Sequence, residues 1–427
     1  MAPRVLVLSS TTSYRTDDFL RAAVRLGVEA VLGTNRCHEL AGLWPREAFG
    51  GSVPIEFRHE AEAADAIVRE AARAPFAAIV PTDDATADIA ARAAERLGLR
   101  GNSVGAATTA RNKRLMREAL ARGGVAHPRF AVFDAADEPA RAWGELAAAG
   151  WQFPVVVKPL LCSASRGVIR ADDEDSLAAA WWRLHALLQT PALRAVEDPD
   201  GQRVLVEAFV PGDEVALEGI LSDGLLTPLA LFDKPDPLDG PYFEETIYVT
   251  PSRHAATVQR AIERTTAMAC AALGLRHGPV HAELRVGPAG PVVIEVAARS
   301  IGGLCARTLR FGLGATSLEE LVIGNALGRE LGSLERSGAA GVMMIPIPRG
   351  GVLGEVRGVE AARAVPLVED VQVTARAGEV VVPLPEGAAY LGFLFARGET
   401  PAAVERALRA AHERLAFEIT PLLPKLV

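Results

Sequence analysis

The first hundred residues alternate between short apolar runs and polar, helix-forming stretches, and this alternation limits the folds open to the chain. VLVLSS at 5–10 is predicted as a buried strand, a helix is expected near 17–27, and VEAVLGT follows as a second strand. AAIVPTDD repeats the pattern before a helix that ends at Leu97. Strands that alternate with helices form a parallel sheet with helices on its faces. We therefore predict a parallel α/β layer over roughly residues 1–103.

The pattern changes after residue 106. TARNKRLMREALARGGVAHP is predicted as one amphipathic helix, ended by Gly123, Gly124 and Pro128. The next β-runs are RFAVF, FPVVVKP, GVIRA, RVLVEAFV and EVALEGILS, with helices near 174–188 and 254–273. From residue 338 onward β-runs alternate with Gly/Pro turns, and TPAAVERALRAAHERLAF is predicted as the final helix.

Composition and charge exclude several classes of protein. With 49% apolar and 23% charged residues the chain is ordinary for a globular protein, and its formal net charge of −8 argues against nucleic-acid binding. The apolar run VLVL is too short for a signal peptide, and no stretch is long and apolar enough to span a membrane. Cys37, Cys162, Cys270 and Cys305 have neither metal-ligand spacing nor disulfide density. We expect a soluble, reduced, cytoplasmic protein.

Residues 278–303, GPVHAELRVGPAGPVVIEVAARSIGG, are predicted as a hairpin that carries two glutamates on apolar strands. A register centred on Ala289, with 288–290 as a three-residue loop, sets Glu283 opposite Glu295. Facing carboxylates repel unless a cation lies between them, and Mg²⁺ prefers such oxygen ligands. The hairpin therefore predicts a metal site, with two solvated surface glutamates as the alternative.

Lysine is rare in this chain. Of 45 basic residues only four are lysine: Lys113, Lys158, Lys234 and Lys425. The few lysines are expected at positions where a compact ammonium is needed and a planar guanidinium does not serve. The alternative is that these lysines remain by chance. The segment 153–170, FPVVVKPLLCSASRGVIR, brings Lys158 to a loop of small residues whose N–H groups can approach phosphate. An ordinary hairpin with a serine-rich loop is the alternative, and the GK[ST] ending of a Walker loop is missing.

A third segment, VLVEAFVPGDEVALEGIL, joins two β-runs through Glu207–Val210. The backbone of this junction is suited to hydrogen-bond an adenine edge, and Glu214 to accept hydrogen bonds from ribose hydroxyls. A plain connecting strand is the alternative.

The order and spacing of these residues resemble the ATP-grasp superfamily over essentially the whole chain. The resemblance implies an α/β and α+β ATP-grasp fold with a leading Rossmann-like parallel domain, two nucleotide-clamping subdomains and a closing α+β domain. The implied boundaries are 1–105 for the leading domain, 106–206 for the small subdomain with the phosphate loop, 207–336 for the large subdomain with the metal site, and 337–427 for the closing domain.

The resemblance also implies the residues of the site. ATP would be bound by Lys113, Lys158, Ser163, Ser165, Gly167, Glu207, Phe209, Val210 and Glu214. Mg²⁺, with Mn²⁺ as a substitute, would be bound by Glu283 and Glu295, and the catalytic residues would be Arg299, Lys158 and Glu245. The loop reads SASRG rather than glycine-rich, and Ala297 stands where many members have an asparagine metal ligand, which leaves the number of metal ions open.

Within the superfamily, residues 231–252 and 381–419 resemble the L-amino acid ligases. The implied substrate pocket consists of Glu245, Tyr248, His281, Arg299, Gly302 and Gly303. In one member a histidine stands where this chain has Tyr248. The roles of His281 and Lys234 stay open between substrate contact and packing, and Cys162 is interpreted as structural.

The implied function is an ATP-dependent ligase that activates a carboxylate as an acyl phosphate and couples it to an amine. Carboxylation through carboxyphosphate, as in biotin carboxylase, is the first alternative, and a non-catalytic nucleotide-binding scaffold is the second. The implied partners are small carboxylates and amines. Neither nucleic acid nor membrane is expected, and a homodimer is left open.

Overall fold

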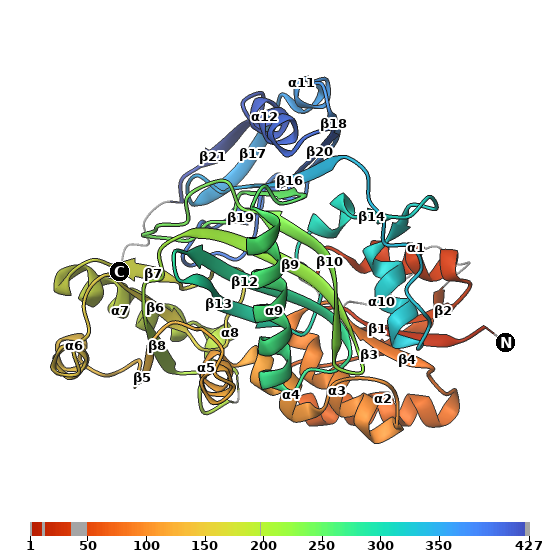
Figure 1. The fold of residues 1–427 in the computed structure, drawn as a ribbon, viewed down its shortest axis with the longest axis horizontal. Helices are drawn as coiled ribbons and strands as arrows, with labels where there is room; N and C mark the ends of the chain where they lie inside the picture. Colours follow the sequence, from red (N-terminus) through yellow and green to blue (C-terminus); the bar gives the residue numbers. More distant parts are fainter. Residues whose placement is uncertain (1, 11–12, 36–48, 197, 423–427) are drawn as a thin grey trace.

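The structure is a computed structural model that describes residues 2–10, 13–35, 49–196 and 198–422 (Figure 1). Cys37 and Lys425, both considered in the sequence, lie outside the described residues.

The amino-terminal domain is the predicted parallel α/β layer, with the sheet order β3-β2-β1-β4. Its strands are β1 Arg4–Leu8, β2 Glu29–Thr34, β3 Phe49–Pro54 and β4 Ala78–Pro81, and its helices are α1 Thr16–Leu26, α2 Glu60–Arg73 and α3 Asp84–Leu97. Side chains alternate across the sheet, so that Val5 and Val7 join the core beside α1, while Leu6 and Leu8 join the core beside α2 and α3. α10, Leu318–Ala326, comes from far along the chain and packs beside α1.

Two helices, α4 Val104–Arg111 and α5 Lys113–Arg122, stand where one helix was predicted. Asn112 between them is extended, and its side-chain oxygen accepts hydrogen bonds from the N–H groups of Arg114 and Leu115 at 3.0 and 3.2 Å. An asparagine in this geometry caps a new helix and ends the previous one. The prediction of a single helix was wrong for this reason, and the break makes Lys113 the first residue of α5.

The small subdomain is an antiparallel sheet of order β5-β8-β6-β7 with helices on one face. Its strands are β5 Phe130–Asp134, β6 Val155–Pro159, β7 Ile169–Ala171 and β8 Arg203–Ala208, and its helices are α6 Pro139–Ala148, α7 Glu174–Leu188 and α8 Pro191–Arg194. Val155 and Val157 pack into the core with α6 and α7. Because side chains alternate, Val156 and Lys158 lie on the opposite face of β6.

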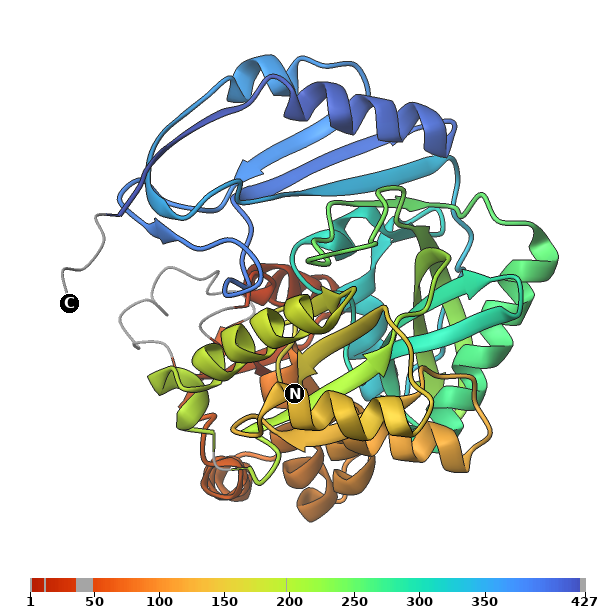
Figure 2. The ribbon, with the colours of Figure 1, turned by 90° about the vertical axis from the view of Figure 1, so that its left-hand side faces the viewer.

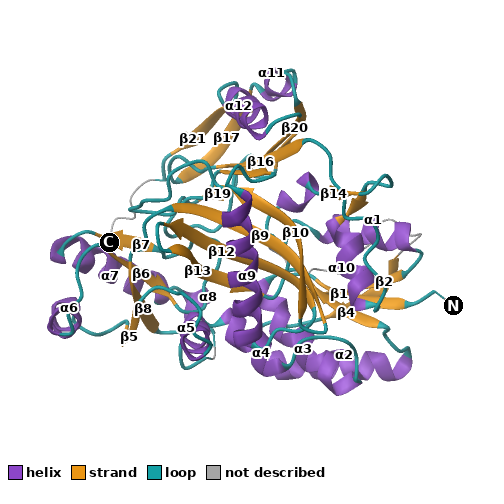
Figure 3. Ribbon diagram, in the orientation of Figure 1, coloured by secondary structure: helices purple, strands orange, loops and turns teal. Residues whose placement is uncertain are grey.

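The largest sheet has the order β13-β12-β9-β10-β11-β16-β20-β18 and crosses the predicted boundary at 336/337. Figure 3 labels most of its strands. Its strands are β9 Asp213–Ser222, β10 Leu225–Asp233, β11 Ile247–Thr250, β12 Gly278–Gly287, β13 Gly290–Ala297, β16 Ala339–Ile345, β18 Val368–Val373 and β20 Gly392–Gly398. The junction is the antiparallel pair β11–β16, which sets Tyr248 beside Val342. The closing domain therefore shares its main sheet with the large subdomain.

Helices cover this sheet in separate places. α9, Ala256–Leu273, packs with α5 against β9, β12 and β13, and α12, Pro401–His412, packs on β16 and β20 (Figure 2). The remaining elements are η2 Cys305–Thr308, β14 Arg310–Phe311, β15 Thr316–Ser317, β17 Gly351–Arg357, α11 Val359–Arg363, β19 Val380–Val381 and β21 Ala416–Thr420. The final helix, predicted to extend to Phe417, ends at His412. AFEIT instead alternates as a strand that buries Ile419 and pairs with β17.

Candidate active site

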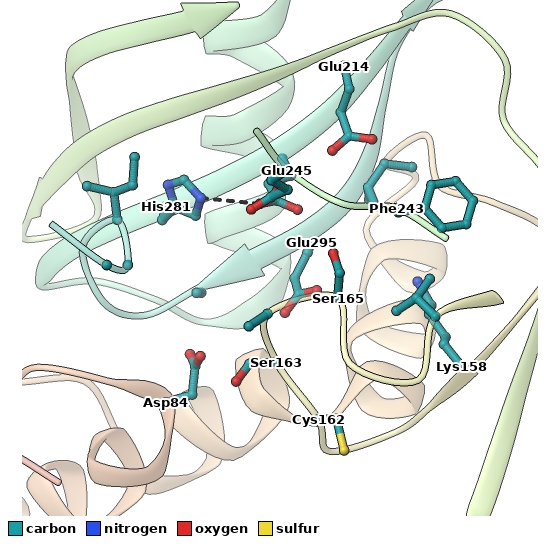
Figure 4. Close-up of a pocket in the computed structure, with 18 of the residues that line it drawn as sticks. Asp84, Lys158, Cys162, Ser163, Ser165, Glu214, Phe243, Glu245, His281 and Glu295 are labelled. Atoms are coloured by element: carbon teal, nitrogen blue, oxygen red, sulfur yellow. Dashed lines mark hydrogen bonds and ion pairs between the residues drawn. The ribbon is translucent and has the colours of Figure 1, made fainter. Parts of the chain in front are cut away.

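A cavity of about 260 Å³ lies where the amino-terminal domain, the small subdomain and the large sheet meet. Figure 4 shows Cys162, Ser163 and Ser165 on one loop, with Glu245, His281 and Glu295 across the cavity from it. Every predicted site residue except Gly167 lines this cavity.

The predicted pairing of the two hairpin glutamates is confirmed, because Glu283 lies opposite Glu295 in the β12–β13 register. The predicted three-residue loop is wrong. Gly287 pairs with Gly290 around a two-residue turn, and a bulge at Ile294 restores the glutamate pairing. Glu283 Oε1 lies 3.2 Å from Lys234 Nζ, and Glu295 Oε1 lies 3.4 Å from Lys113 Nζ.

These two carboxylates offer the donor set that Mg²⁺ prefers. Both are on one face of adjoining strands, and neither has both oxygens in an ion pair. Burial by itself would raise the pKa of Glu283, but Lys234 and His281 hold it well below its usual range, so the carboxylate is ionised. Buried Ala297 lines the cavity opposite His281 and offers no ligand atom. The pair fits a magnesium ion, and the third ligand of many relatives is absent at this position.

A second acidic cluster surrounds the buried ammonium of Lys234. Its Nζ lies 2.7 Å from Glu214 Oε1 and also contacts Glu245 and Glu283. Carboxylate oxygens of these three glutamates lie within 4.8 Å of one another, as metal ligands would. Burial opposes the charge on Lys234, but the carboxylates raise its pKa well above the usual range. In this cluster the lysine already supplies the neutralising cation.

Glu214 was predicted to hold the ribose. Its Oε1 is paired with Lys234, and its Oε2 accepts a hydrogen bond from Arg285 Nε at 3.0 Å. Both oxygens are therefore engaged in ion pairs, and the ribose role stays a prediction. Burial, with Glu283 nearby, raises the pKa of Glu245 to about 7 although Lys234 opposes the shift.

The lysines bind the walls of the cavity together. Lys113 Nζ donates to the carbonyl oxygen of Cys162 at 2.7 Å, so it bridges the small-residue loop and Glu295. Lys158 Nζ lies 2.6 Å from Glu207 Oε2, and Arg117 Nε donates to Glu207 Oε1 at 2.5 Å. Burial alone would raise the pKa of Glu207, but the two cations lower it. Lys158 is thus paired with Glu207 at the end of β6, and burial lowers the pKa of Lys158 although Glu207 opposes the shift.

The small-residue loop has an unusual backbone. Ala164 and Ser165 have φ values of 55° and 53°, in the left-handed region that non-glycine residues rarely adopt. Such conformations cost about 1–2 kcal/mol per residue and gather at ligand sites. Gly167, predicted to contact ATP, does not line the cavity. Its φ is 76°, and its N–H donates to the carbonyl oxygen of Pro385 at 2.8 Å, so that group is engaged elsewhere.

One end of the cavity is an apolar slot beside the β8–β9 junction. Its lining side chains include Pro128, Val156, Val168, Ala208, Phe209, Val210 and Ile294. The guanidinium carbons of Arg170 and Arg285 lie 4.4 and 5.0 Å from the centre of the Phe209 ring. These residues include the predicted adenine hinge, and the adenine role of Phe209 and Val210 stays a prediction.

The sequence analysis missed the contribution of the amino-terminal domain. Residues 13–15 and 82–84 follow β1 and β4, which are neighbours in the sheet, and both segments line the cavity. Asp84 binds Arg299 with two hydrogen bonds, to Nε at 3.0 Å and to Nη2 at 2.9 Å. Ligands of parallel sheets bind at the carboxyl ends of strands where the order reverses. That rule, applied to the TDD that ends the β4 run, is the signal that would have found Asp84.

His281 has two acidic partners. Its Nδ1 lies 3.1 Å from Glu218 Oε2, and its Nε2 lies 3.4 Å from Glu283 Oε1. Burial opposes protonation, but the hydrogen bonds to Glu218 and Glu283 raise the pKa of His281 to about 9. The main-chain N–H of Ile301 donates to Glu218 as well, at 3.1 Å. His281 therefore links Glu283 to the segment that carries Arg299.

The fold and the cavity together define an ATP-grasp protein. Models of the ATP-grasp domain and the ATP-grasp N-terminal domain match residues 151–308 and 20–101, and the model of L-amino acid ligase C-terminal domain 2 matches residues 343–420. Within the superfamily, the chain belongs to the L-amino acid ligase family.

Two kinds of relatives support this assignment. The crystal structure of L-amino acid ligase from Bacillus licheniformis superposes with a TM-score of 0.80 at 25% identity, over 98% of this chain and 99% of that one. Alanine–anticapsin ligase of Bacillus subtilis (strain 168) is 29% identical over 259 residues, 57% of this chain and 52% of the relative. Dapdiamide A synthase of Enterobacter agglomerans is 30% identical over 49% of this chain and 47% of the relative. The chain thus spans about half the length of the curated relatives it matches.

Membrane insertion has no structural support in the described ranges. Of the helices they contain, none combines the length and the apolar character that crossing a bilayer requires.

Proposed function

We propose that the protein is an ATP-dependent carboxylate–amine ligase that joins an amino acid to an amine, giving an amide or dipeptide with ADP and phosphate. The observation that carries the proposal is the cavity in which the Glu283–Glu295 pair, Lys113 and the small-residue loop converge. Membership of the L-amino acid ligase family supports it.

The reaction begins with the substrate carboxylate. One of its oxygens attacks the γ-phosphorus of ATP, and the bond between the γ-phosphorus and the β–γ bridging oxygen breaks. ADP is released, and the substrate becomes an acyl phosphate. Such a transfer needs positioning and charge neutralisation more than covalent help. Mg²⁺ held by Glu283 and Glu295 would neutralise phosphate charge. Lys113 and Lys158 would hold the phosphates, and Arg299 would orient the carboxylate.

The second step forms the amide. The amine nitrogen attacks the acyl carbon, and inorganic phosphate leaves. The amine must first lose a proton from its ammonium form, and a group with a pKa near neutrality is suited to accept it. Glu245, with its pKa raised to about 7 by burial and by Glu283, is the residue we assign to hold the ammonium and take the proton.

The test is a phosphate-release screen with ATP, Mg²⁺ and pairs of amino acids, followed by mass spectrometry of the products. We expect an amide product together with stoichiometric ADP. Turnover that depends on bicarbonate and gives no amide would favour the carboxyphosphate alternative. ATP binding with no turnover for any pair would favour the scaffold alternative.

Glu295→Gln tests the metal assignment within that screen. A neutral amide does not balance a divalent cation, so ATP turnover should fall by about 10²-fold or more while the circular-dichroism spectrum is unchanged. Glu355→Gln is the matched control, because Glu355 is an exposed strand glutamate outside the cavity. Equal turnover in the two variants would remove the metal role from Glu295.

A further inference from the structure

The cavity has a second apolar region that the nucleotide does not explain. The slot at the β8–β9 junction would take a planar base. Lys113, Lys158, Glu283 and Glu295, which we call the ionic centre, would take the phosphates and the metal. Beyond the ionic centre the lining consists of Tyr14, Tyr248, Cys305, Met344 and Tyr390, which we call the distal wall. These residues come from the β1–α1 loop, β11, η2, β16 and the segment before β20. The amino-terminal domain, the large subdomain and the closing domain therefore all contribute to one apolar surface.

Packing contacts show that the distal wall is one surface. The rings of Tyr14 and Tyr390 lie 5.4 and 6.2 Å from the ring of Phe393, and Phe393 is paired with Met344 across β16–β20. Tyr248, Cys305 and Met344 belong to a single core cluster, against which Tyr14 and Tyr390 pack. The distal wall is therefore a continuous border of the cavity rather than a set of scattered side chains.

The distal wall is also electrically neutral. Burial raises the pKa of Tyr248, Tyr390 and Cys305, so the phenols and the thiol stay protonated near neutral pH. The ammonium of Lys234 lies 5.0 Å from the ring centre of Tyr248, but it is already paired with Glu214, Glu245 and Glu283. The guanidinium of Arg15, which also lines the cavity, donates to Ser300, to the carbonyl oxygen of Ile301 and to Glu319. The charges closest to the wall, Glu245 and Lys234, are paired with each other. A charged substrate side chain would therefore lose its hydration here without gaining an unpaired partner, which costs several kcal/mol.

The position of the distal wall links it to one substrate. Ile301, Gly302 and Gly303 line the cavity directly after Arg299 in the chain, and Ile301 and Cys305 share the core cluster of the distal wall. A carboxylate oriented by Arg299 would therefore extend its α-substituent toward this wall.

We propose that the activated substrate is an α-amino acid with an uncharged, apolar side chain of medium to large size, and that Met344 sets the length of side chain that fits. The proposal rests on the proposed ligase function and makes the apolar amino acid the first residue of the product. It assigns side-chain selection to the closing domain, which supplies Met344 and Tyr390.

Strand β16 contains a matched control. Met343 and Met344 are neighbours, are 5% and 4% exposed, and point to opposite faces of the strand. Met343 packs in the core beneath α12, whereas Met344 lines the cavity. Truncation of either methionine removes the same atoms from a core, so the loss of packing is shared and any difference in selectivity belongs to the distal wall.

The experiment compares the wild type, Met344→Ala and Met343→Ala by ADP release and by fragmentation of the products in a mass spectrometer. With one amine in excess, we expect leucine, methionine and phenylalanine to exceed aspartate and lysine in kcat/KM by about 10²-fold. In Met344→Ala the ratio of kcat/KM for tryptophan to that for leucine should rise by about tenfold or more. In Met343→Ala this ratio should stay at the wild-type value, and KM for ATP should be unchanged in both.

Three results would overturn the proposal. The first is charged amino acids appearing in the first position of the product as readily as apolar ones. The second is apolar residues occurring only in the second position, and the third is an equal shift of selectivity in both methionine variants. Each of these leaves amide formation intact, so the ligase function would stand while the substrate assignment falls. Absence of amide with every pair, from protein that still binds ATP, would instead overturn the ligase function itself.

Discussion

At the scale of single residues, the ion pair between Asp84 and Arg299 connects the amino-terminal domain to the site. Burial by itself would raise the pKa of Asp84, but Arg299, with Lys113 and His281 farther away, lowers it, so the pair is fully charged at neutral pH. The two parallel hydrogen bonds fix the plane of the guanidinium. Asp84 thus positions the group that we assign to orient the substrate carboxylate.

Asp84→Asn should therefore reduce the rate more than the binding of ATP. The amide keeps the volume but loses the charge and one acceptor, so Arg299 is free to turn. We expect kcat to fall by about 10–10²-fold, the cost of a small misplacement of a positioning group, while KM for ATP changes by less than about threefold. Steady-state kinetics with ATP varied at a saturating amino-acid pair measures both values.

Asp18→Asn is the matched control, because Asp18 makes the same two-bond pair with Arg307 between the same two parts of the molecule, away from the cavity. Equal losses of kcat in the two variants would mean that Asp84 matters only for docking of the amino-terminal domain.

The residues that the sequence revealed and those it hid differ in how far apart their partners lie. Glu283 and Glu295 are twelve positions apart on one hairpin, so alternation and a guess at the turn were enough to pair them. Asp84 and Arg299 are 215 positions apart, and their meeting depends on how the parallel sheet docks on the larger one. Lys234 was ambiguous for the same reason, since its glutamates belong to β9, β12 and the segment before β11.

At the scale of elements, the segment 382–391 between β19 and β20 forms a strap that touches both ends of the site. The N–H of Gly167 donates to the carbonyl oxygen of Pro385. Arg166 Nε donates to the main-chain carbonyl oxygen of Glu386 at 2.9 Å. The Glu386 carboxylate also accepts two hydrogen bonds from Arg183 on α7. Farther along the strap, Tyr390 lines the distal wall. Sequence periodicity did not predict this contact, because the strap has no regular secondary structure.

Trypsin gives a direct measure of this contact, since Arg166 lies within the small-residue loop. In Glu386→Ala the strap loses its side-chain anchor to α7, and we expect cleavage after Arg166 to be about two- to fivefold faster. That factor corresponds to the 0.2–1 kcal/mol of an exposed ion pair. Glu145→Ala, which removes an exposed pair with Arg141 in the same subdomain, is the control and should leave the rate unchanged. The same rate in wild type and Glu386→Ala would show that the strap does not hold the loop.

At the scale of the whole molecule, the domains are joined through buried contacts that the sequence could not specify. Strands β11 and β16 pair in one sheet across the predicted division at 336/337, which itself stays a prediction. On the other side, Arg15 from the amino-terminal domain reaches Glu319 on α10, with 2.6 Å between Nη2 and Oε1 and both side chains almost fully buried. α10 itself covers one face of the amino-terminal sheet. The sequence pattern predicts the separate domains, but it does not predict the contacts that join them.

The Arg15–Glu319 pair makes the stability of the whole molecule depend on acid. Burial alone would raise the pKa of Glu319, but Arg15 lowers it below the ordinary value of a glutamate. A carboxyl group whose pKa is depressed by folding stabilises the protein above the unfolded pKa, and that stabilisation is lost as the pH falls through the folded pKa. Glu319→Gln leaves the guanidinium buried without its partner charge, so the free energy of unfolding at pH 7 should fall by about 3–5 kcal/mol.

Urea unfolding from pH 7 down to pH 3 should therefore show the curves of wild type and Glu319→Gln beginning to converge below the pKa of an unfolded glutamate, about 4.3. The convergence continues until the carboxylate of the folded wild type has taken up a proton. Glu330→Gln, an exposed glutamate just beyond α10, should follow the wild type at every pH. The double variant Arg15→Met/Glu319→Met should recover much of the loss, because it removes both buried charges together. A gap between wild type and Glu319→Gln that stays constant with pH would assign the loss to packing, and the ion pair would then not be what joins the amino-terminal domain to α10.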